Sequence, residues 1–269
     1  MNHLLRELAP FGSDVWALLD DEATTRLTVA LAARRLVDFA GPKGWTHSAV
    51  DLGRTDDVAH ESIRVKRRRI LPLLEARADF RLRREELVDS SRGATDVDLG
   101  PLDTAALSLA AFENELVFGG PRDASGLGEV SPHPVGYHDG SPDSFRAAVG
   151  GAVAALRSAG VGGPYSLAAS PSDWTTIVET DDDGYPLRTQ LEGILGGSLE
   201  WTPGITGSVV LSTRGGDYEL TVGEDLSLGY SDHDIAEVGL YVEETLAFRV
   251  NTPEAAVRLL AASSGAVRA

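Results

Sequence analysis

The histidines, carboxylates and hydroxyl groups of this sequence form none of the short patterns that mark common active sites. The six histidines are scattered along the chain, and no Gly-x-Ser-x-Gly elbow, phosphate-binding Walker loop or His-Glu-x-x-His motif occurs. Pairs of carboxylates carry little information in a chain with 41 Asp and Glu residues. A site assembled from distant residues stays open, but no pattern nominates one. We therefore predict no catalytic residue and no enzyme activity.

An acidic stretch at residues 179–186 has the residue types of a cation site. If its glycine takes the glycine position of a calcium-binding loop, three carboxylates fall at ligand positions: Glu179, Asp181 and Asp183. The closing position, however, holds Gln190 in place of a bidentate glutamate. Elsewhere, His133 and His138 lie five positions apart without a third ligand in view. We predict no metal site, and on residue type alone the acidic stretch is a solvated turn.

Basic residues gather in one segment of a chain that is acidic overall. The net charge is −17, yet 11 of the 24 Lys and Arg residues fall between residues 45 and 93. The run Lys66-Arg67-Arg68-Arg69 could contact nucleic acid, but no aromatic residues are interleaved with it for base stacking. Since the negative charge of the whole chain would also repel polyphosphate, we predict no nucleic-acid partner.

Composition sets the broad class of the protein. A chain of 269 residues can form one large domain or two interleaved ones. It has no cysteine, which excludes disulfides and thiolate zinc sites. Residues 1–11 carry charges and a proline where a signal peptide needs an unbroken apolar run, and no stretch approaches the roughly 20 apolar residues of a membrane span. We expect a cytoplasmic protein without membrane contact.

Apolar spacing predicts both helices and strands, an α+β protein. Helices are expected at residues 13–40, 102–118, 141–160, 172–178, 187–195 and 253–260. Strands are expected at residues 165–169 and 237–250, and an antiparallel meander should pair residues 209–211 with residues 218–222.

Three charged residues in these elements have more than one interpretation. Glu244 interrupts the apolar face of the long strand, so it either marks a bulge or an exposed strand end, or faces a cation on a neighbouring subunit. Arg34 and Asp38 lie one helical turn apart, which favours an i,i+4 ion pair on residue type alone.

Eight short strings, in this order and spacing, resemble the encapsulins, the bacterial nanocompartment shell proteins once described as linocin-type bacteriocins. Actinobacterial encapsulins are the most similar branch. The strings are Leu8-Ala9-Pro10, Arg34-Arg35-Leu36-Val37-Asp38, Gly41-Pro42-Lys43-Gly44-Trp45, Gly163-Pro164-Tyr165, Gly184-Tyr185-Pro186-Leu187, Ser212-Thr213-Arg214-Gly215-Gly216-Asp217, the segment 223–230 and Glu244-Thr245-Leu246-Ala247-Phe248.

The resemblance implies the Hong Kong 97-type phage capsid fold. Its parts would be a lumen-facing N-terminal helix at 1–45, an extended arm called the E-loop with flanking strands at 46–93, the peripheral-domain spine helix at 94–139, an axial domain with a pore loop at 140–225, and the peripheral-domain long strand with a C-terminal helix at 226–269. The basic segment would then be an arm lying across an acidic neighbouring subunit.

The resemblance also implies two sites. An apolar groove would bind a short targeting peptide at the C-terminus of a cargo enzyme, through Leu27, Leu31, Arg34, Asp38, Leu228 and Tyr230. A pore loop would consist of Asp181, Asp182, Asp183, Gly184 and Tyr185, and its repeated aspartates would form an acidic ring. Some encapsulins stack a flavin on a Trp where this chain has Glu85, so we predict no cofactor.

The expected function is therefore that of a container. Copies of the chain would form an icosahedral shell, most simply a T=1 60-mer, around a dye-decolorising peroxidase or, as second choice, a ferritin-like protein. Two alternatives stay open at this point: a phage or prophage major capsid protein, which would package nucleic acid, and a secreted lytic protein or protease.

Overall fold

A computed structural model describes residues 3–120, 126–179, 181–182 and 185–262. The chain divides into two compact units, and each is built from three separate stretches of sequence. The first unit comprises residues 1–23, 39–109 and 220–249, and the second comprises residues 24–38, 110–219 and 250–269. Helices and strands occur in both units, so the α+β expectation is confirmed.

The first unit is organised on one long strand, β13 (Glu237–Val250), whose predicted bounds are confirmed. Strands β12 (Ser227–His233) and β4 (Leu74–Arg83) both pair with it antiparallel, and the sheet continues through β11 (Tyr218–Val222) to β1 (Asp38–Ala40). Strand β13 has neighbours along both edges, and most of its side chains, which alternate between the two faces of the sheet, are buried. Glu244 is fully buried in regular register opposite Ala76, so the expectation of a bulge or an exposed end is wrong.

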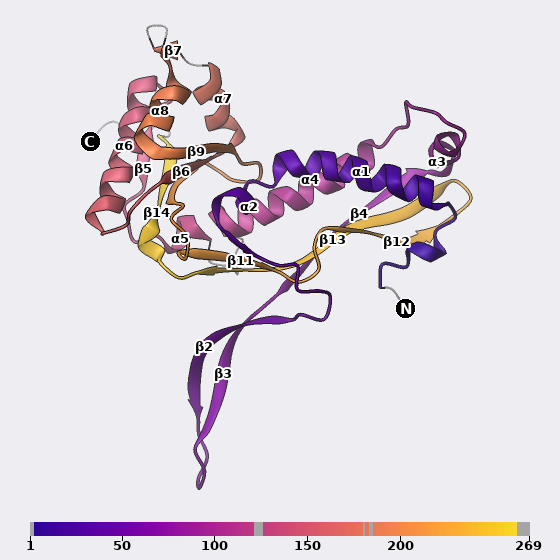
Figure 1. Cartoon of the computed structure of the whole chain (residues 1–269), viewed down its shortest axis with the longest axis horizontal. Coiled ribbons are helices and arrows are strands. Elements are labelled where there is room, and N and C mark those ends of the chain that lie inside the picture. Colours follow the sequence, from indigo (N-terminus) through magenta and orange to yellow (C-terminus); the bar gives the residue numbers. More distant parts are fainter. Residues whose placement is uncertain (1–2, 121–125, 180, 183–184, 263–269) are drawn as a thin grey trace. The chain divides into compact units, whose positions relative to one another are not determined.

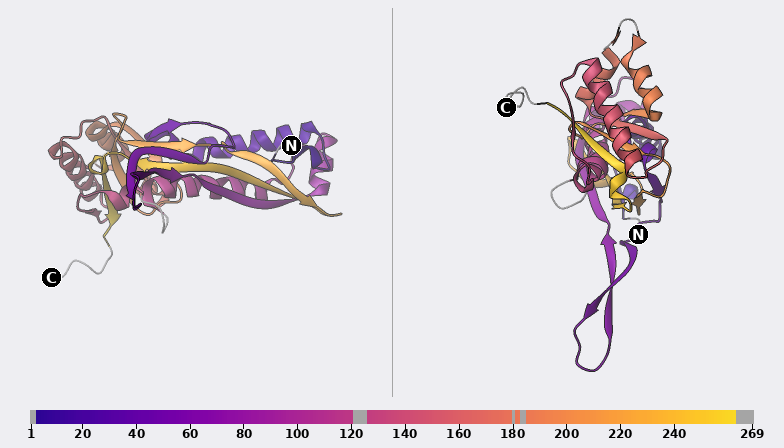
Figure 2. Two further views of the ribbon diagram at one scale, coloured as in Figure 1. Left: turned by 90° about the horizontal axis from the view of Figure 1, so that it is seen from below. Right: turned by 90° about the vertical axis from the view of Figure 1, so that its left-hand side faces the viewer.

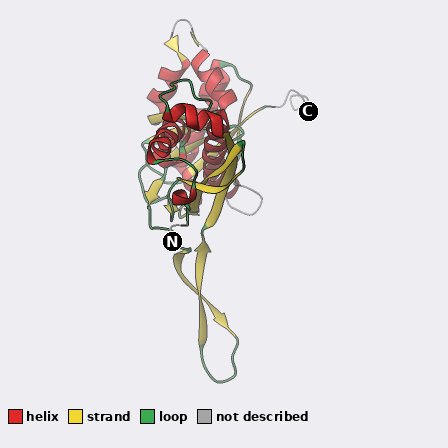
Figure 3. Cartoon of the chain, turned by 90° about the vertical axis from the view of Figure 1, so that its right-hand side faces the viewer, coloured by secondary structure: helices red, strands yellow, loops and turns green. Residues whose placement is uncertain are grey.

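A two-stranded hairpin is the other β element of this unit. Strands β2 (Ala49–Val58) and β3 (Val65–Pro72) pair with each other and with no other described strand, and they form the twisted ribbon seen in Figures 1 and 3. Most of β3 and of the connecting loop is exposed, including Ile63 and Ile70, whereas β2 is partly covered and buries Val50. The hairpin thus spans residues 49–72, and residues 74–83 belong to the main sheet as β4. That the hairpin is the arm lying across a neighbouring subunit stays a prediction.

Four helical elements accompany the sheet of the first unit. They are η1 (Arg6–Leu8), α3 (Arg84–Ser91), and the parts of α1 (Ser13–Ala30) and α4 (Gly100–Asn114) that precede residues 24 and 110. Helix α4 passes directly into the π-helical turn η2 (Glu115–Gly119), so the helix predicted to end before Gly119-Gly120 is confirmed. In the described part of the chain, no helix combines the length and the apolarity that a membrane span requires.

The second unit contains a five-stranded mixed sheet. Its strands lie in the order β5 (Gly136–His138), β14 (Ala256–Ala261), β10 (Ser208–Ser212), β6 (Tyr165–Ala169) and β9 (Gly196–Trp201). Helix α6 (Pro142–Ser158) packs against β5, β14 and β10 (Figure 2). It buries Phe145, Val149 and Leu156. As predicted, a serine begins this helix: the Ser141 hydroxyl accepts a hydrogen bond from the Ser144 amide.

Short elements complete the second unit. They are α2 (Ala33–Leu36), α5 (Leu127–Val130), α7 (Pro171–Glu179), β7 (Asp181–Asp182), β8 (Tyr185–Pro186), α8 (Leu187–Leu195) and η3 (Pro253–Ala255). Helices α7 and α8 confirm the two short helices predicted at residues 172–178 and 187–195.

Three expectations about secondary structure are wrong, each because distant pairing overrides a local pattern. The helix expected to reach residue 40 ends at Ala30, and residues 38–40 form strand β1. The expected meander does not form, because β10 and β11 belong to different sheets. The expected last helix is only the turn η3, since Val257 pairs with Val210 and makes residues 256–261 a buried strand.

Candidate functional site

The predicted groove residues Leu27 and Leu31 lie at the end of α1, where the helix stops and the chain turns into α2. Leu27 is buried and Leu31 is half-buried. The last carbonyl groups of a helix have no partner inside it. Here Arg35 supplies one: Nη1 donates to the carbonyl oxygens of Thr28 and Leu31, both at 3.1 Å. The guanidinium therefore caps the helix end that carries the two leucines.

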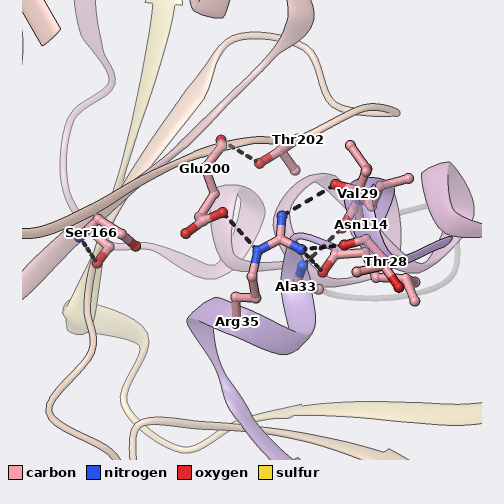
Figure 4. A network of polar contacts seen from close by, with 11 residues as sticks. Thr28, Val29, Ala33, Arg35, Asn114, Ser166, Glu200 and Thr202 are labelled. Atoms are coloured by element: carbon pink, nitrogen blue, oxygen red, sulfur yellow. Dashed lines mark hydrogen bonds and ion pairs between the residues drawn. The ribbon is translucent and has the colours of Figure 1, made fainter. Parts of the chain in front are cut away.

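The same guanidinium ties this turn to the sheet of the second unit. Its Nε donates to Oε2 of Glu200 on β9 at 2.8 Å, and its Nη2 lies 3.4 Å from the carbonyl oxygen of Val29 (Figure 4). A bond between a guanidinium and a carboxylate is stronger than one between neutral groups. The direction in which α1 ends is thus fixed by a contact with a strand far along the sequence.

Asn114 holds the turn from its other side. Its Oδ1 accepts from the amide of Ala33 at 3.0 Å, and its Nδ2 donates to the carbonyl oxygens of Ala30 at 2.9 Å and Pro203 at 3.0 Å. Asn114 is fully buried, so these bonds satisfy polar groups that water does not reach. Nearby, Gly204 has φ +91°, and a Cβ there would clash with the Ala111 carbonyl oxygen.

The structure separates Arg34 from Asp38, which the sequence placed one helical turn apart. Arg34 Nε donates to Oε2 of the fully buried Glu113 at 2.8 Å, and 18% of the Arg34 side chain is exposed. Asp38 is exposed in β1, where its Oδ2 accepts from the amide of Gly216 at 2.6 Å. The predicted i,i+4 pair is wrong, because the helix has ended before residue 38.

Asp38 also borders a small pocket of the second unit. The pocket has a volume of about 140 Å³, and its walls are Arg35, Leu36, Val37, Asp38, Ser212, Thr213, Gly215, Asp217 and Tyr218. Arg214 closes the loop beside it by donating through Nε and Nη2 to both carboxylate oxygens of Asp217, at 2.9 Å each. This loop joins β10 and β11, which the sequence predicted to pair and which belong to different sheets.

The other two predicted groove residues, Leu228 and Tyr230, lie on β12 in the first unit. Both are buried, with 3% and 7% of their surface exposed. The Tyr230 amide donates to the carbonyl oxygen of Leu4 at 2.9 Å, and the Tyr230 hydroxyl lies 2.6 Å from Nδ1 of His233. That these two residues and the four around α2 form one groove stays a prediction, because the two groups belong to different units.

The sequence did not predict a role for His3. The ring of His3 stacks on the indole of Trp45, with 4.0 Å between ring centroids. Its Nε2 lies 3.6 Å from Oε1 of Glu224 and 3.4 Å from Oε1 of Glu243. Burial raises the pKa of the Glu243 carboxyl, although the positive charge of protonated His3 would oppose that shift. No local motif joins residues from opposite ends of the chain.

Part of the predicted pore loop lies outside the described residues, namely Asp183 and Gly184. Asp181 and Asp182 form strand β7, which pairs antiparallel with β8 so that Asp182 is opposite Tyr185. Tyr185 is 56% exposed. The role of this loop stays a prediction.

A buried polar cluster occupies the second unit at the start of α7. Ser208 Oγ donates to Oδ2 of Asp173 at 2.6 Å, and Nε2 of His138 lies 3.6 Å from Oδ1 of Asp173. Burial would raise the pKa of Asp173, but its contacts with His138 and Ser208 hold that pKa below the ordinary value.

Among the described residues, no group of three or more His, Cys, Asp or Glu side chains could hold a metal ion. Glu85, at the position of the flavin-stacking Trp, is exposed in the first turn of α3.

Comparison with known proteins gives matches along the whole chain. A family model described as "Encapsulating protein for peroxidase" matches residues 1–247. The type 1 encapsulin shell protein of Rhodospirillum rubrum is 41% identical over 280 residues and covers 100% of both chains. Those of Brevibacterium linens and Mycobacterium tuberculosis are 41% and 39% identical, and each alignment covers 96% of this chain and 99% of the relative.

Solved structures give the fold. The virus-like particle from Pyrococcus furiosus superposes with a TM-score of 0.63 at 18% identity, covering 90% of this chain and 97% of that one. A protein of Mycobacterium phage Bobi superposes with a TM-score of 0.54 at 13% identity, covering 87% and 91%. The fold is therefore the α+β Hong Kong 97-type fold of phage major capsid proteins, as the sequence resemblance implied.

Proposed function

This chain belongs to the encapsulin family of shell proteins, and on that premise we propose that copies of it assemble into a closed icosahedral shell around an enzyme. The observation that carries the proposal is the alignment with the Rhodospirillum rubrum shell protein, which spans 100% of both chains at 41% identity. A T=1 shell of 60 copies is the simplest closed form. Closure matters because a head-to-tail contact that does not close continues to grow.

The β2–β3 hairpin supports assembly on physical grounds. It exposes Ile63 and Ile70 to the extent of 62% and 54%, and no other described strand pairs with it. An isolated two-stranded hairpin is only marginally stable in water. A neighbouring subunit that covers this arm would bury the isoleucines, and obligate contacts of this kind bury about 2,000 to 5,000 Å².

Charges on the hairpin would orient that contact more than strengthen it. Arg69 Nε donates to Asp56 Oδ1 at 2.7 Å and Arg68 Nη1 to Asp51 Oδ2 at 3.1 Å, so part of the basic run is neutralised within the hairpin. Arg67 is the remaining arginine of the run, and in a chain of net charge −17 it would meet an acidic neighbour. Complementary charge mainly sets register and partner choice.

We further propose that the shell holds its cargo through a short C-terminal peptide of the cargo enzyme. The candidate contacts are the six predicted groove residues, of which Arg34 is engaged with Glu113 and so would contribute less than the apolar ones. The family description names a peroxidase, which supports a dye-decolorising peroxidase as cargo, with a ferritin-like protein as second choice. Several weak grooves suffice when the cargo is oligomeric, because linked peptides raise the effective concentration.

Small solutes would enter through a pore lined by the loop of residues 181–185. Repeated around an axis, its aspartates would attract cations and repel anions.

The chain itself would have a structural role and no enzyme activity, as the names of its relatives suggest. A cytoplasmic location and the absence of a bound flavin stay predictions.

Negative-stain electron microscopy of the chain expressed alone, after gel filtration, tests the shell. Uniform closed particles would support it, and a stable monomer or dimer would refute it.

Co-expression with a dye-decolorising peroxidase, with and without its C-terminal tail, tests cargo loading, because only the tailed enzyme should co-purify. Nucleic acid protected from nuclease inside the particles would favour the alternative of a phage capsid protein, which shares the fold. The names of the relatives weigh against the other alternative, a secreted lytic protein or protease.

A further inference from the structure

A short N-terminal strap, defined here as residues 3–8, lies along β12 in the first unit. The Tyr230 amide donates to the Leu4 carbonyl oxygen at 2.9 Å, and the Tyr241 hydroxyl lies 3.4 Å from the His3 carbonyl oxygen. His3 and Leu4 lie in a turn, Leu5 is left-handed with φ 50°, and residues 6–8 form η1, so the strap meets the edge of β12 as a turn and not as an added strand. The side chain of Leu4 is buried, with 9% of the residue exposed.

The rest of the strap is held by Arg6. Its Nη2 donates to Asp20 Oδ2 at 2.7 Å, and its guanidinium lies over the indole of Trp16 at 4.1 Å from the ring centroid. Trp16 Nε1 donates in turn to the Arg6 carbonyl oxygen at 3.3 Å. Because this anchor lies at η1, residues 3 and 4 could leave β12 while the strap stays attached to α1.

The position of His3 identifies an imperfectly filled acidic site. Glu243 is 97% buried, since 3% of its surface is exposed, and its Oε1 makes no hydrogen bond within the described residues. His3 Nε2 lies 3.4 Å away and likewise makes none. Glu224, at 3.6 Å from the same nitrogen, adds a second carboxylate. A buried carboxylate oxygen without a hydrogen bond is costly.

The guanidinium of Arg77 lies nearby, but it does not neutralise both Glu243 and Glu224. Arg77 donates through Nε to Asp79 Oδ1 at 2.9 Å and places its guanidinium 3.5 Å from the ring centroid of Tyr241. An ammonium or a guanidinium offers more donors than imidazole and keeps its charge at neutral pH. A lysine or arginine side chain would therefore satisfy Glu243 and Glu224 better than His3 does.

We propose that the strap is a resident competitor for a peptide segment of a partner protein, whose Lys or Arg replaces His3 between Glu224 and Glu243 and whose adjacent apolar residue replaces Leu4. The strap itself indicates what the edge of β12 accepts, a basic residue followed by a buried apolar one. The inference rests on the proposed function in that the partner would be a cargo enzyme, and it adds to that function a means of limiting peptide access.

A fluorescent reporter tests the proposal in assembled shells. Green fluorescent protein is given a C-terminal tail that copies residues 3–8 with lysine in place of histidine, and is co-expressed with the full chain. Fluorescence per purified shell should exceed that of a reporter with a glutamine at the same tail position by about tenfold. The double substitution Glu224→Gln with Glu243→Gln should remove this advantage, whereas Leu4→Ala, which loosens the strap, should raise loading severalfold.

Two controls make each outcome informative. Glu129→Gln changes an exposed glutamate of α5 in the second unit and should leave loading unchanged. A glutamate in the reporter tail tests charge on the unaltered chain, so the proposal stays testable if the double variant fails to assemble. Equal loading of the lysine, glutamine and glutamate tails into intact shells would overturn the inference alone. Absence of shells by electron microscopy would instead refute the proposed function.

Discussion

Arg34 and Glu113 form a largely buried ion pair inside the second unit, with 2.8 Å between Nε and Oε2. Glu113 is fully buried, and the Arg34 side chain is 18% exposed. The resemblance to encapsulins had assigned Arg34 to the surface of a peptide groove. Its place in the structure gives it a second and stronger role, which is to compensate a carboxylate that water does not reach.

Arg34→Ala should therefore lower the free energy of unfolding by about 3–5 kcal/mol, because Glu113 loses its guanidinium partner. Thermal unfolding followed by circular dichroism measures the change. Replacing both residues by leucine should recover most of the loss, since a well-packed apolar pair can substitute for a buried ion pair. An unchanged melting temperature for Arg34→Ala, combined with reduced cargo loading, would instead assign Arg34 to the groove.

Asn114→Ala should be destabilising by about 2–4 kcal/mol, because it leaves the Ala33 amide and the Ala30 and Pro203 carbonyl groups without their partner. The end of α1 should also become more open to hydrogen exchange, most clearly at Ala33. Ser108→Ala on the same helix removes only an exposed hydroxyl that bonds to Thr104, and serves as the control. Equal melting temperatures for the two variants would contradict this account of the turn.

Asp173 should make stability depend on pH in the acid range. Its pKa in the folded protein lies below the unfolded value, since the contacts with His138 and Ser208 outweigh burial. The ionised carboxylate therefore contributes stability above the unfolded pKa of about 4, and this contribution is lost as the pH falls through the folded pKa. Asp173→Asn should lower the melting temperature at pH 7 and flatten its fall between about pH 5 and pH 3.

The control for this pH dependence is Asp96→Asn, which changes an exposed aspartate. Melting curves recorded at half-unit steps of pH would compare the two variants with the parent chain. If the melting temperatures of the parent chain and of Asp173→Asn fall in parallel across the acid range, the buried cluster does not govern acid stability.

The hairpin isoleucines should be needed for assembly and dispensable for folding. In the single chain, Ile63 and Ile70 are mostly exposed, so aspartate at both positions costs the isolated subunit little. In a shell, the same change would bury two charges in a subunit contact. Gel filtration and electron microscopy should show free subunits with an unchanged circular dichroism spectrum. Ser62→Asp, beside Ile63 in the same loop, should still assemble; normal shells from the isoleucine variant would contradict the prediction.

Elements whose pattern is local could be predicted from the sequence. The period-two apolar run of residues 237–250 became β13 with the same bounds, and the serine before Pro142 became the cap of α6. In both cases the information lies within a few neighbouring residues, because side-chain spacing and a capping hydroxyl act over one or two turns. The order and spacing of short strings along the chain also sufficed to indicate the family and its capsid fold.

Only the tertiary structure decided which strands pair, where α1 ends and what the site residues contact. The run at residues 209–222 reads as a hairpin, yet its two strands enter different sheets, since each finds a distant partner. Helical spacing continues past Ala30, but Asn114 and Arg35 bind the carbonyl and amide groups that the next turn would have used. His3 meets Glu243 from the opposite end of the sequence. Such contacts depend on the free energy of long-range burial and pairing, which local propensity does not encode.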